Sequence, residues 1–263
     1  MHFEDLEFVV LWEQITGDRM PPPFIFTSRT PMYYDFLREK RSAAERVEAR
    51  WDGALGNLAE VMAEPDIRIV VNGFDGRDLK HADGRVRMMA LRRAGRGYLL
   101  KQLPGETYVH SGGFTAVECD PLSLAEAVVD ALPEVGAGRQ ADVKLDGTQG
   151  SDYADDDIGR TIIDDVFEDA AVQRTKRFLN SSVVCAGTIE VIQGHSKFGP
   201  RGITEHLLEW RDLEDDGRYV IGGEPPFIAA AVDSSRLTNA INVRVAAVVR
   251  AIRDERGILS GSE

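Results

Sequence analysis

The stretch FTAVECDPLSLAEAV, residues 114–128, returns in a similar pattern further along the chain as FIAAAVDSSRLTNAI, residues 227–241. Each copy begins with a short apolar run typical of a strand, passes an aspartate that can cap a helix, and continues with apolar residues at helical spacing. The copies align at a phenylalanine, an aspartate and a leucine: Phe114 with Phe227, Asp120 with Asp233, and Leu124 with Leu237. An internal repeat of this kind predicts a chain built from two similar halves.

The similarity extends upstream of both copies. VRMMALRRAGRGYLLKQ, residues 86–102, parallels TEHLLEWRDLEDDGRYVIGG, residues 204–223, and each reads as two strands joined by a turn. A further strand pattern precedes each of them, IRIVV at 67–71 and SVVCAGTIEVIQG at 182–194. We therefore predict an α/β protein of the α+β type. Its centre would be a quasi-two-fold, mixed or antiparallel sheet made from two meander-plus-helix repeats and flanked by helical bundles.

Three helices are expected outside the repeats. Residues 4–15 read as a short helix. A long helix is expected to begin with Thr30 as its N-cap and Pro31 as its first residue, and to run to Pro65. Acidic residues early and basic residues late in 155–179 favour a third helix there. The buried face of the long helix would be formed by Val47, Trp51, Leu55, Leu58 and Met62.

These patterns describe a single domain over residues 1–263. Its halves span about residues 30–133 and about residues 161–252, and an acidic stretch at about 134–160 joins them. The joining stretch is rich in Gly, Asp and Ser and contains few large apolar side chains. We therefore expect a loop or a partly disordered linker there.

Composition and charge narrow the function classes. The chain has 43% apolar and 29% charged residues, as in ordinary globular proteins, and a net charge of −13. This charge disfavours non-specific binding to nucleic acid or to an anionic membrane. The N-terminus lacks the positive region of a signal peptide, and arginines interrupt the apolar tract near the C-terminus, so no membrane insertion is expected. Cys119 and Cys185 lie in strand patterns and are expected to be free thiols in a cytoplasmic protein.

The acidic stretch DLEDDGRYVIGG, residues 212–223, begins like a calcium-binding EF-hand loop. Its twelfth position is Gly223, however, where that loop needs a bidentate glutamate, and its flanks read as strands. In the repeat it occupies a hairpin-turn position, and Asp-Asp-Gly suits such a turn. A second acidic run, at 155–157, fails the same template because Ile158 occupies a ligand position. We expect a turn, and no metal site.

No motif for catalysis stands out. The glycine-rich nucleotide loops, the GxSxG nucleophile and the HExxH zinc motif are all absent. His195 and His206 have no nearby cysteine with which to bind zinc. We therefore predict no catalytic, cofactor-binding or metal-binding residues, and favour a binding protein. The alternative that stays open is an acid-dependent hydrolase with a carboxylate site between two sheets, and a purely structural scaffold is a third possibility.

Three stretches resemble the EspG family, the chaperones of actinobacterial type VII (ESX) secretion. LWEQITGDRMPPPF, residues 11–24, resembles the family's Leu-Trp helix end followed by prolines. LAEVMAEPDIRIVV, residues 58–71, resembles its helix, proline and first strand. HSKFGPRGITEHLLEWRDLEDDGRYVIGG, residues 195–223, is similar to its segment with a Trp, an acidic turn and Gly-Arg-Tyr. The chain departs from the family at the start of the long helix, where Thr30-Pro31 replaces a Gly and an Arg.

The resemblance implies a non-enzymatic cytosolic chaperone that needs no cofactor. Its partner would be the PPE protein of a PE–PPE helical heterodimer, kept soluble for export, and the chaperone alone would be a monomer or a dimer. The client would contact the central sheet face, the loop between the second and third strands, and the C-terminal helices. The residues that these positions imply for partner binding are Phe74 and Leu79 in the loop, and Leu208, Trp210 and Tyr219 in the sheet. For Trp210 and Tyr219 the alternative is ordinary packing in the core.

Overall fold

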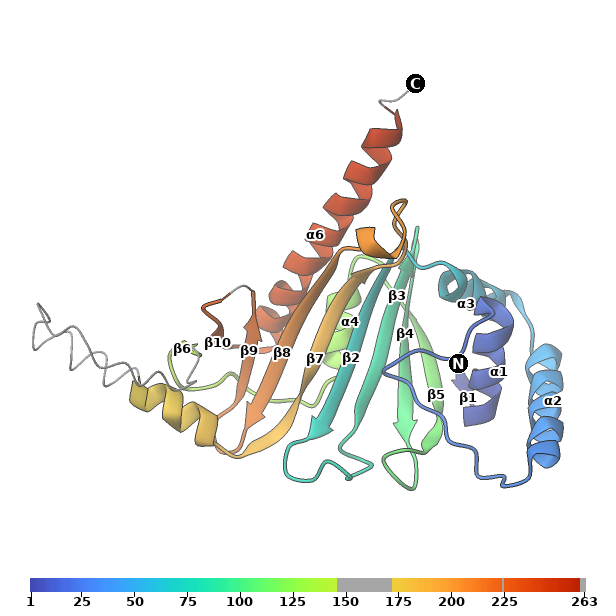
Figure 1. Cartoon of the computed structure of the whole chain (residues 1–263), viewed down its shortest axis with the longest axis horizontal. Helices are drawn as coiled ribbons and strands as arrows, with labels where there is room; N and C mark the ends of the chain where they lie inside the picture. The colour runs from blue at the N-terminus through green and yellow to red at the C-terminus, as the bar shows by residue number, and fades with distance from the viewer. Residues whose placement is uncertain (146–171, 224, 261–263) are drawn as a thin grey trace, which may run out of the picture.

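A computed structural model describes residues 1–145, 172–223 and 225–260 of the chain (Figure 1). Ten strands form one sheet in which every pair of neighbouring strands is antiparallel. The strands are β1 (His2–Phe3), β2 (Ile67–Asp75), β3 (Val86–Arg93), β4 (Arg96–Pro104), β5 (Ser111–Cys119), β6 (Val143–Lys144), β7 (Val183–Gln193), β8 (Glu205–Leu213), β9 (Arg218–Gly222) and β10 (Ile228–Ala231). The helices are α1 (Asp5–Thr16), α2 (Tyr33–Ala49), α3 (Gly53–Ala63), α4 (Leu124–Asp130), α6 (Ser234–Ser260), the short 3-10 helix η1 (Pro200–Gly202) and residues 172–180.

The order of the strands reproduces the sequence repeat. Across the sheet it is β1-β5-β4-β3-β2-β7-β8-β9-β10-β6, so that β2 and β7 pair at the centre and the two meanders run outward from them. The β3–β4 hairpin corresponds to β8–β9, and β5 followed by α4 corresponds to β10 followed by α6. The predicted fold class and its quasi-two-fold arrangement are confirmed. The boundaries proposed for the two halves stay a prediction.

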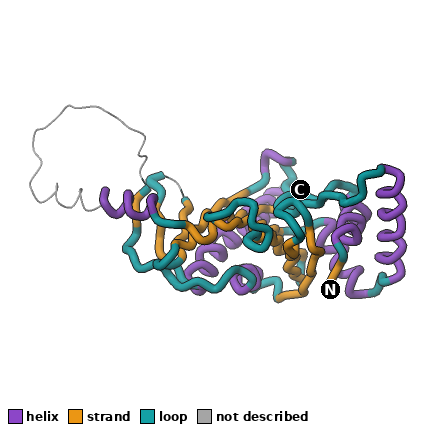
Figure 2. The backbone as a smooth tube through the Cα atoms, turned by 90° about the horizontal axis from the view of Figure 1, so that it is seen from below, coloured by secondary structure: helices purple, strands orange, loops and turns teal. Residues whose placement is uncertain are grey.

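Helices cover the two faces of the sheet unequally (Figures 1 and 2). On the first face, α4 and α6 bury the inward side chains of the central strands, from Ile67 in β2 to Trp210 in β8. On the second face, α1 and α3 pack against β3, β4 and β5, and α2 packs on α1. The helix at 172–180 lies at the other end of that face, where Phe178 joins the cluster around Tyr219. Between these two coverings, no helix of the described residues lies on the second face of the central strands.

The predicted long helix is in fact two helices. It begins at Tyr33 with Met32 as its N-cap, two residues later than expected, and α2 ends at Ala49. A new helix starts after Asp52, whose side-chain oxygen accepts a hydrogen bond from the Leu55 amide at 2.8 Å. An aspartate followed by a glycine offers a strong N-cap, and here it prevails over continuous helical spacing. Trp51 falls in the connection and is 50% exposed instead of lying on a buried face.

The predicted linker is partly built into the sheet. Residues 143–144 form β6, which pairs with β10, and Val143 is buried. The Gly138 amide donates a hydrogen bond to the Arg218 carbonyl, which lays the preceding segment on β9. Residues 146–160 of the linker and most of the helix predicted at 155–179 lie outside the described residues, and 172–180 is helical as expected.

The centre of the sheet depends on two glycines that face each other across β2 and β7. Gly73 pairs with Gly187, and the ring of the buried Trp210 lies against both of them. A Cβ at Gly73 would lie 2.8 Å from the ring, and a Cβ at Gly187 would overlap the ring and the Asn72 carbonyl oxygen. Only residues without a side chain allow the indole to pack this closely on the central strand pair.

We expect Gly187→Ala to destabilise the protein by about 3 kcal/mol, because the new methyl group must displace the indole or part the central strands. Urea denaturation should show a lower midpoint with the same slope. Gly95→Ala is the control: Gly95 lies in the β3–β4 turn, where a Cβ meets no atom within 4 Å. Equal midpoints for the two variants would contradict the role assigned to the glycine pair.

Candidate partner-binding surface

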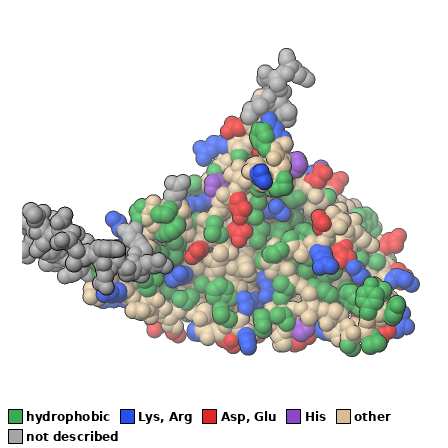
Figure 3. All heavy atoms as spheres, viewed as in Figure 1, with side chains coloured by type: hydrophobic (Ala, Val, Ile, Leu, Met, Phe, Trp, Pro, Cys, Tyr) green, Lys and Arg blue, Asp and Glu red, His purple; other side chains and the backbone are tan. Residues whose placement is uncertain are grey.

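In the part of the chain that the structure describes, one face in the middle of the sheet has no helix over it, and we call it the open face. It consists of the side chains that alternate with the buried ones on β2, β7 and β8. The pairing places them in rows, for example Arg68 beside Ile192 and Thr188 beside Glu209. Figure 3 shows hydrophobic, acidic and basic side chains mixed on this side of the molecule. The open face comprises Arg68, Asn72, Phe74, Ala186, Thr188, Glu190, Ile192, Glu205, Leu207, Glu209 and Arg211.

Two of the predicted sheet contacts point to the opposite side. Leu208 and Trp210 are buried beneath α4 and α6, with at most 1% exposure, so they do not lie on the open face. Leu207, which is 48% exposed, holds the outward position on β8 instead. Sequence reasoning missed Leu207 because two adjacent leucines interrupt the alternation of the strand. The orientation of the two leucines could have been assigned from Trp210. Leu208 lies two residues before Trp210, and residues two apart on a strand point to the same side of the sheet.

Tyr219 is also buried, in the cluster under the helix at 172–180. Its hydroxyl donates to Asp216 Oδ2 at 2.9 Å and accepts from the Gln140 amide at 2.9 Å, while its ring meets Phe178 edge-on at 5.1 Å. Burial raises the pKa of Tyr219 to about 12. Leu208, Trp210 and Tyr219 are therefore all packed in the core and are not exposed on the open face.

Asp216, which accepts the hydrogen bond from Tyr219, belongs to the acidic stretch at 212–223 that begins like a calcium-binding loop. Asp215, Asp216 and Gly217 form the turn between β8 and β9, with positive φ at Asp215 (58°) and Gly217 (155°). Asp216 accepts hydrogen bonds from the Arg139 amide and from Tyr219. The prediction of a hairpin turn is confirmed. Within the described ranges, no three His, Cys, Asp or Glu side chains are grouped to hold a metal ion.

The β2–β3 loop, residues 76–85, closes one end of the open face. Phe74 is half-buried just before it, and Leu79 is 58% exposed at its tip. The loop is ordered by the buried carboxylate of Asp75, which is hydrogen-bonded to His81 Nδ1 at 2.9 Å and accepts from the Arg77 amide at 2.9 Å. These bonds, His81 first, hold the pKa of Asp75 well below its usual range. Leu79 is thus presented on a structured loop.

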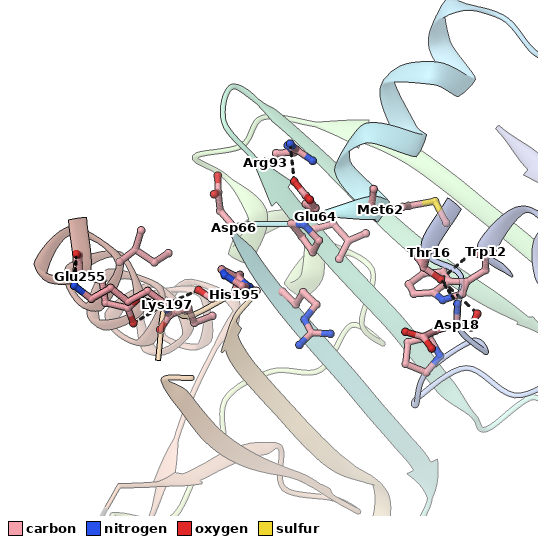
Figure 4. A pocket seen from close by; sticks show the side chains of 18 of the residues that line it. Trp12, Thr16, Asp18, Met62, Glu64, Asp66, Arg93, His195, Lys197 and Glu255 are labelled. Atoms are coloured by element: carbon pink, nitrogen blue, oxygen red, sulfur yellow. Dashed lines mark hydrogen bonds and ion pairs between the residues drawn. The ribbon is translucent and has the colours of Figure 1, made fainter. Parts of the chain in front are cut away.

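A groove of about 1200 Å³ lies at the other end of the open face (Figure 4). It runs between the ends of α1 and α3, the start of β2, and the last turns of α6. Glu255 of α6 joins its two walls by accepting hydrogen bonds from Gln193 Nε2 (3.0 Å), Ser196 Oγ (2.8 Å) and the Lys197 amide (3.0 Å). These bonds, that of Gln193 first, hold the pKa of Glu255 below its usual value. The far end of α6 is thereby tied to the β7–β8 connection.

The groove gives the hydrolase alternative no support. Of its four carboxylates, Glu64 pairs with Arg93 at 3.0 Å, Asp66 accepts from the Ala94 amide at 2.8 Å, and Glu255 is occupied as described. The fourth, Asp18, is exposed to solvent. A general acid would need a carboxyl group with a raised pKa near a second one in a cleft. Burial and nearby Glu205 do raise the pKa of Glu190, but these two side chains belong to the open face and do not line the groove.

Comparison with known proteins shows which solved structure this chain resembles in fold. No helix in the described part of the chain is long and apolar enough to cross a membrane. No curated protein matches the chain in sequence. Its fold is similar to that of EspG5, a Mycobacterium tuberculosis type VII secretion chaperone solved in complex with the PE25–PPE41 dimer. The TM-score is 0.55 at 11% sequence identity, with 93% of this chain and 95% of the EspG5 chain covered, so this likeness concerns the fold.

The sequence itself also matches a family. The model of the EspG family covers residues 4–242, from the first helix to the middle of α6. The matched range includes the first half of the repeat, most of the second half, the open face and the β2–β3 loop. The chain therefore belongs to the EspG family.

Proposed function

We propose that this chain is a chaperone of type VII secretion that binds the PPE partner of a PE–PPE-like helical heterodimer in the cytoplasm. It keeps this client soluble until export and performs no catalysis. The observation that carries the proposal is the open face in a chain of the EspG family: three central strands expose a mixed apolar and polar surface between two helical coverings. The complex of the similar EspG5 with the PE25–PPE41 dimer supplies the kind of client.

The surface has the composition of a partner interface. Leu79, Phe74 and Leu207 provide apolar contact area, and Asn72 and Glu209 provide polar groups around it. An apolar helical tip on the client would otherwise self-associate. A chaperone that binds only the soluble form of the client shifts that equilibrium by mass action.

The buried residues of β8 support this surface without touching the client. Leu208 and Trp210 anchor the strand in the core, and alternation then directs Leu207 and Glu209 outward. Tyr219 acts in the same way by seating Phe178 over β9. Direct contact with the client is proposed for Phe74, Leu79 and Leu207.

Co-expression tests the function. The tagged chain is produced with each PE–PPE pair of its own genome, and the complex is measured by size-exclusion chromatography with light scattering. A soluble 1:1:1 complex is expected for at least one pair, with the PE–PPE pair aggregating when expressed without the chain. Recovery of the folded chain alone with every pair would overturn the proposal.

Truncation of the loop contacts should weaken client binding without unfolding the protein. We expect Leu79→Ala and Phe74→Ala each to raise the Kd for the PE–PPE pair about tenfold, the size of a moderate interface hot spot. The melting temperature of Leu79→Ala should not change, because Leu79 is exposed. Leu122→Ala is the control, since Leu122 is 81% exposed beside α4 and away from the open face. Unchanged affinity for both loop variants would refute this placement.

Substitution of one or the other of the neighbouring leucines of β8 should change either client binding or stability. Leu208→Ala removes a core side chain and is expected to cost about 2–5 kcal/mol in unfolding free energy. Leu207→Ala should leave stability within about 0.5 kcal/mol and weaken client binding instead. Chemical denaturation and binding calorimetry on both variants check this pair of outcomes. The assigned orientation of β8 is wrong if the two effects are exchanged.

A further inference from the structure

Arg68 lines the groove and has no hydrogen-bond or ion-pair partner among the described residues. It lies on β2, half-buried, between Leu91 of β3 and Ile192 of β7 in the strand pairing. Its Nε is buried and has no hydrogen-bond partner, and within the described part of the chain its guanidinium forms no ion pair. The carboxylate of Glu205 on β8, one strand beyond Ile192, acts on it electrostatically without forming an ion pair.

Such an arrangement costs stability. Removing a guanidinium from water is unfavourable unless hydrogen bonds and a counter-charge replace the lost hydration. Burial accordingly lowers the pKa of Arg68 below its ordinary value. A methionine at this position would fill similar space at no such cost, so the folded chain alone gains nothing from the charge.

Asp18 and Arg19, which also line the groove, are exposed to solvent, and the charged side chains around Arg68 are engaged with other groups. Arg93 pairs with Glu64, and Arg256 lies 3.7 Å from Asp66. Lys197 Nζ donates to the Glu255 carbonyl and lies over the Phe198 ring at 4.9 Å. Arg68 is therefore left with fork-like donors beside the apolar wall that Trp12, Met62, Leu91 and Ile252 contribute to the groove. This combination suits a carboxylate carried next to apolar side chains, which a guanidinium can bind through two hydrogen bonds.

We propose that Arg68 determines client specificity by receiving a carboxylate side chain that the client lays in this groove. The inference rests on the proposed function, because Arg68 belongs to the open face and makes the groove continuous with it. It adds a contact at the end of the face remote from Leu79. A client that spans the face would touch the β2–β3 loop at one end and Arg68 at the other. The carboxylate supplies the counter-charge that Arg68 lacks in the free chain.

Substitution of Arg68 tests the proposal by opposite effects on stability and binding. In Arg68→Met the Kd for the PE–PPE pair recovered by co-expression should rise at least about tenfold, the effect of losing a charge-assisted hydrogen bond. Its melting temperature should stay equal or rise. Added NaCl should raise the Kd of the wild type more steeply than the Kd of Arg68→Met, because salt screens the ion pair. Arg68→Lys, which keeps the charge, should recover part of the affinity.

Arg92→Met is the matched control. Arg92 is on the neighbouring strand β3, half-buried and without an ion pair in the described ranges, but it pairs with Ile67 and faces the side covered by α6. It should bind the client as the wild type does. Equal affinity of Arg68→Met and wild type, or a marked loss of stability in Arg68→Met, overturns the role of Arg68 and leaves the chaperone function standing. A wild-type chain that binds no PE–PPE pair overturns both.

Discussion

The packing of one indole on two opposed glycines is the constraint on which the rest of the structure depends. Gly73 and Gly187 meet across β2 and β7, and Trp210 of β8 lies against them. Three strands from both halves of the repeat are thereby locked in one register. Because side chains alternate along a strand, this register decides which residues enter the core beneath α4 and α6 and which remain outside. The residues of the central strands that remain outside the core form the open face.

The quasi-two-fold arrangement explains why a surface is left uncovered. Both halves place their C-terminal helix, α4 or α6, on the same face of the sheet, so that face is fully buried at its centre. On the other face each half brings its own helices from its outer side: α1 to α3 from the N-terminal half and residues 172–180 from the second half. Among the described residues, these coverings reach only the two ends of β7, at Ile192 and at Val183. A single sheet assembled from two repeats is thus closed on one side and open along its symmetry axis on the other.

The charged side chains also differ in role: some stabilise the fold through hydrogen bonds, and Arg68 is proposed to bind the client. The fully buried Arg218 donates to both carboxylate oxygens of Asp212, at 2.7 and 2.8 Å, and to the Pro133 carbonyl, so its hydrogen-bonding capacity is used within the fold. Asp75 and Glu255 are each satisfied by several donors and order the two ends of the open face. Arg68 differs from all of these because it has no hydrogen-bond or ion-pair partner among the described residues, although Glu205 acts on it electrostatically. Removing a charge from water without pairing it costs stability, and at Arg68 the proposed compensation is the carboxylate of the client.

Local patterns in the chain were enough to establish the repeat, the strand-turn-strand units, the hairpin turn at Asp215 to Gly217 and the membership of a binding family, since each depends on neighbours in sequence. They failed where two local signals competed. Helical spacing through Trp51 was overruled by the Asp52 cap, and the adjacent Leu207 and Leu208 left the orientation of β8 undecided. Which leucine faces outward depends on the contact of Trp210 with glycines more than twenty residues away, and the isolation of Arg68 depends on strands from both halves. Contacts between distant segments settle such questions, because burial and charge compensation belong to the assembled sheet and cannot be read from any one strand.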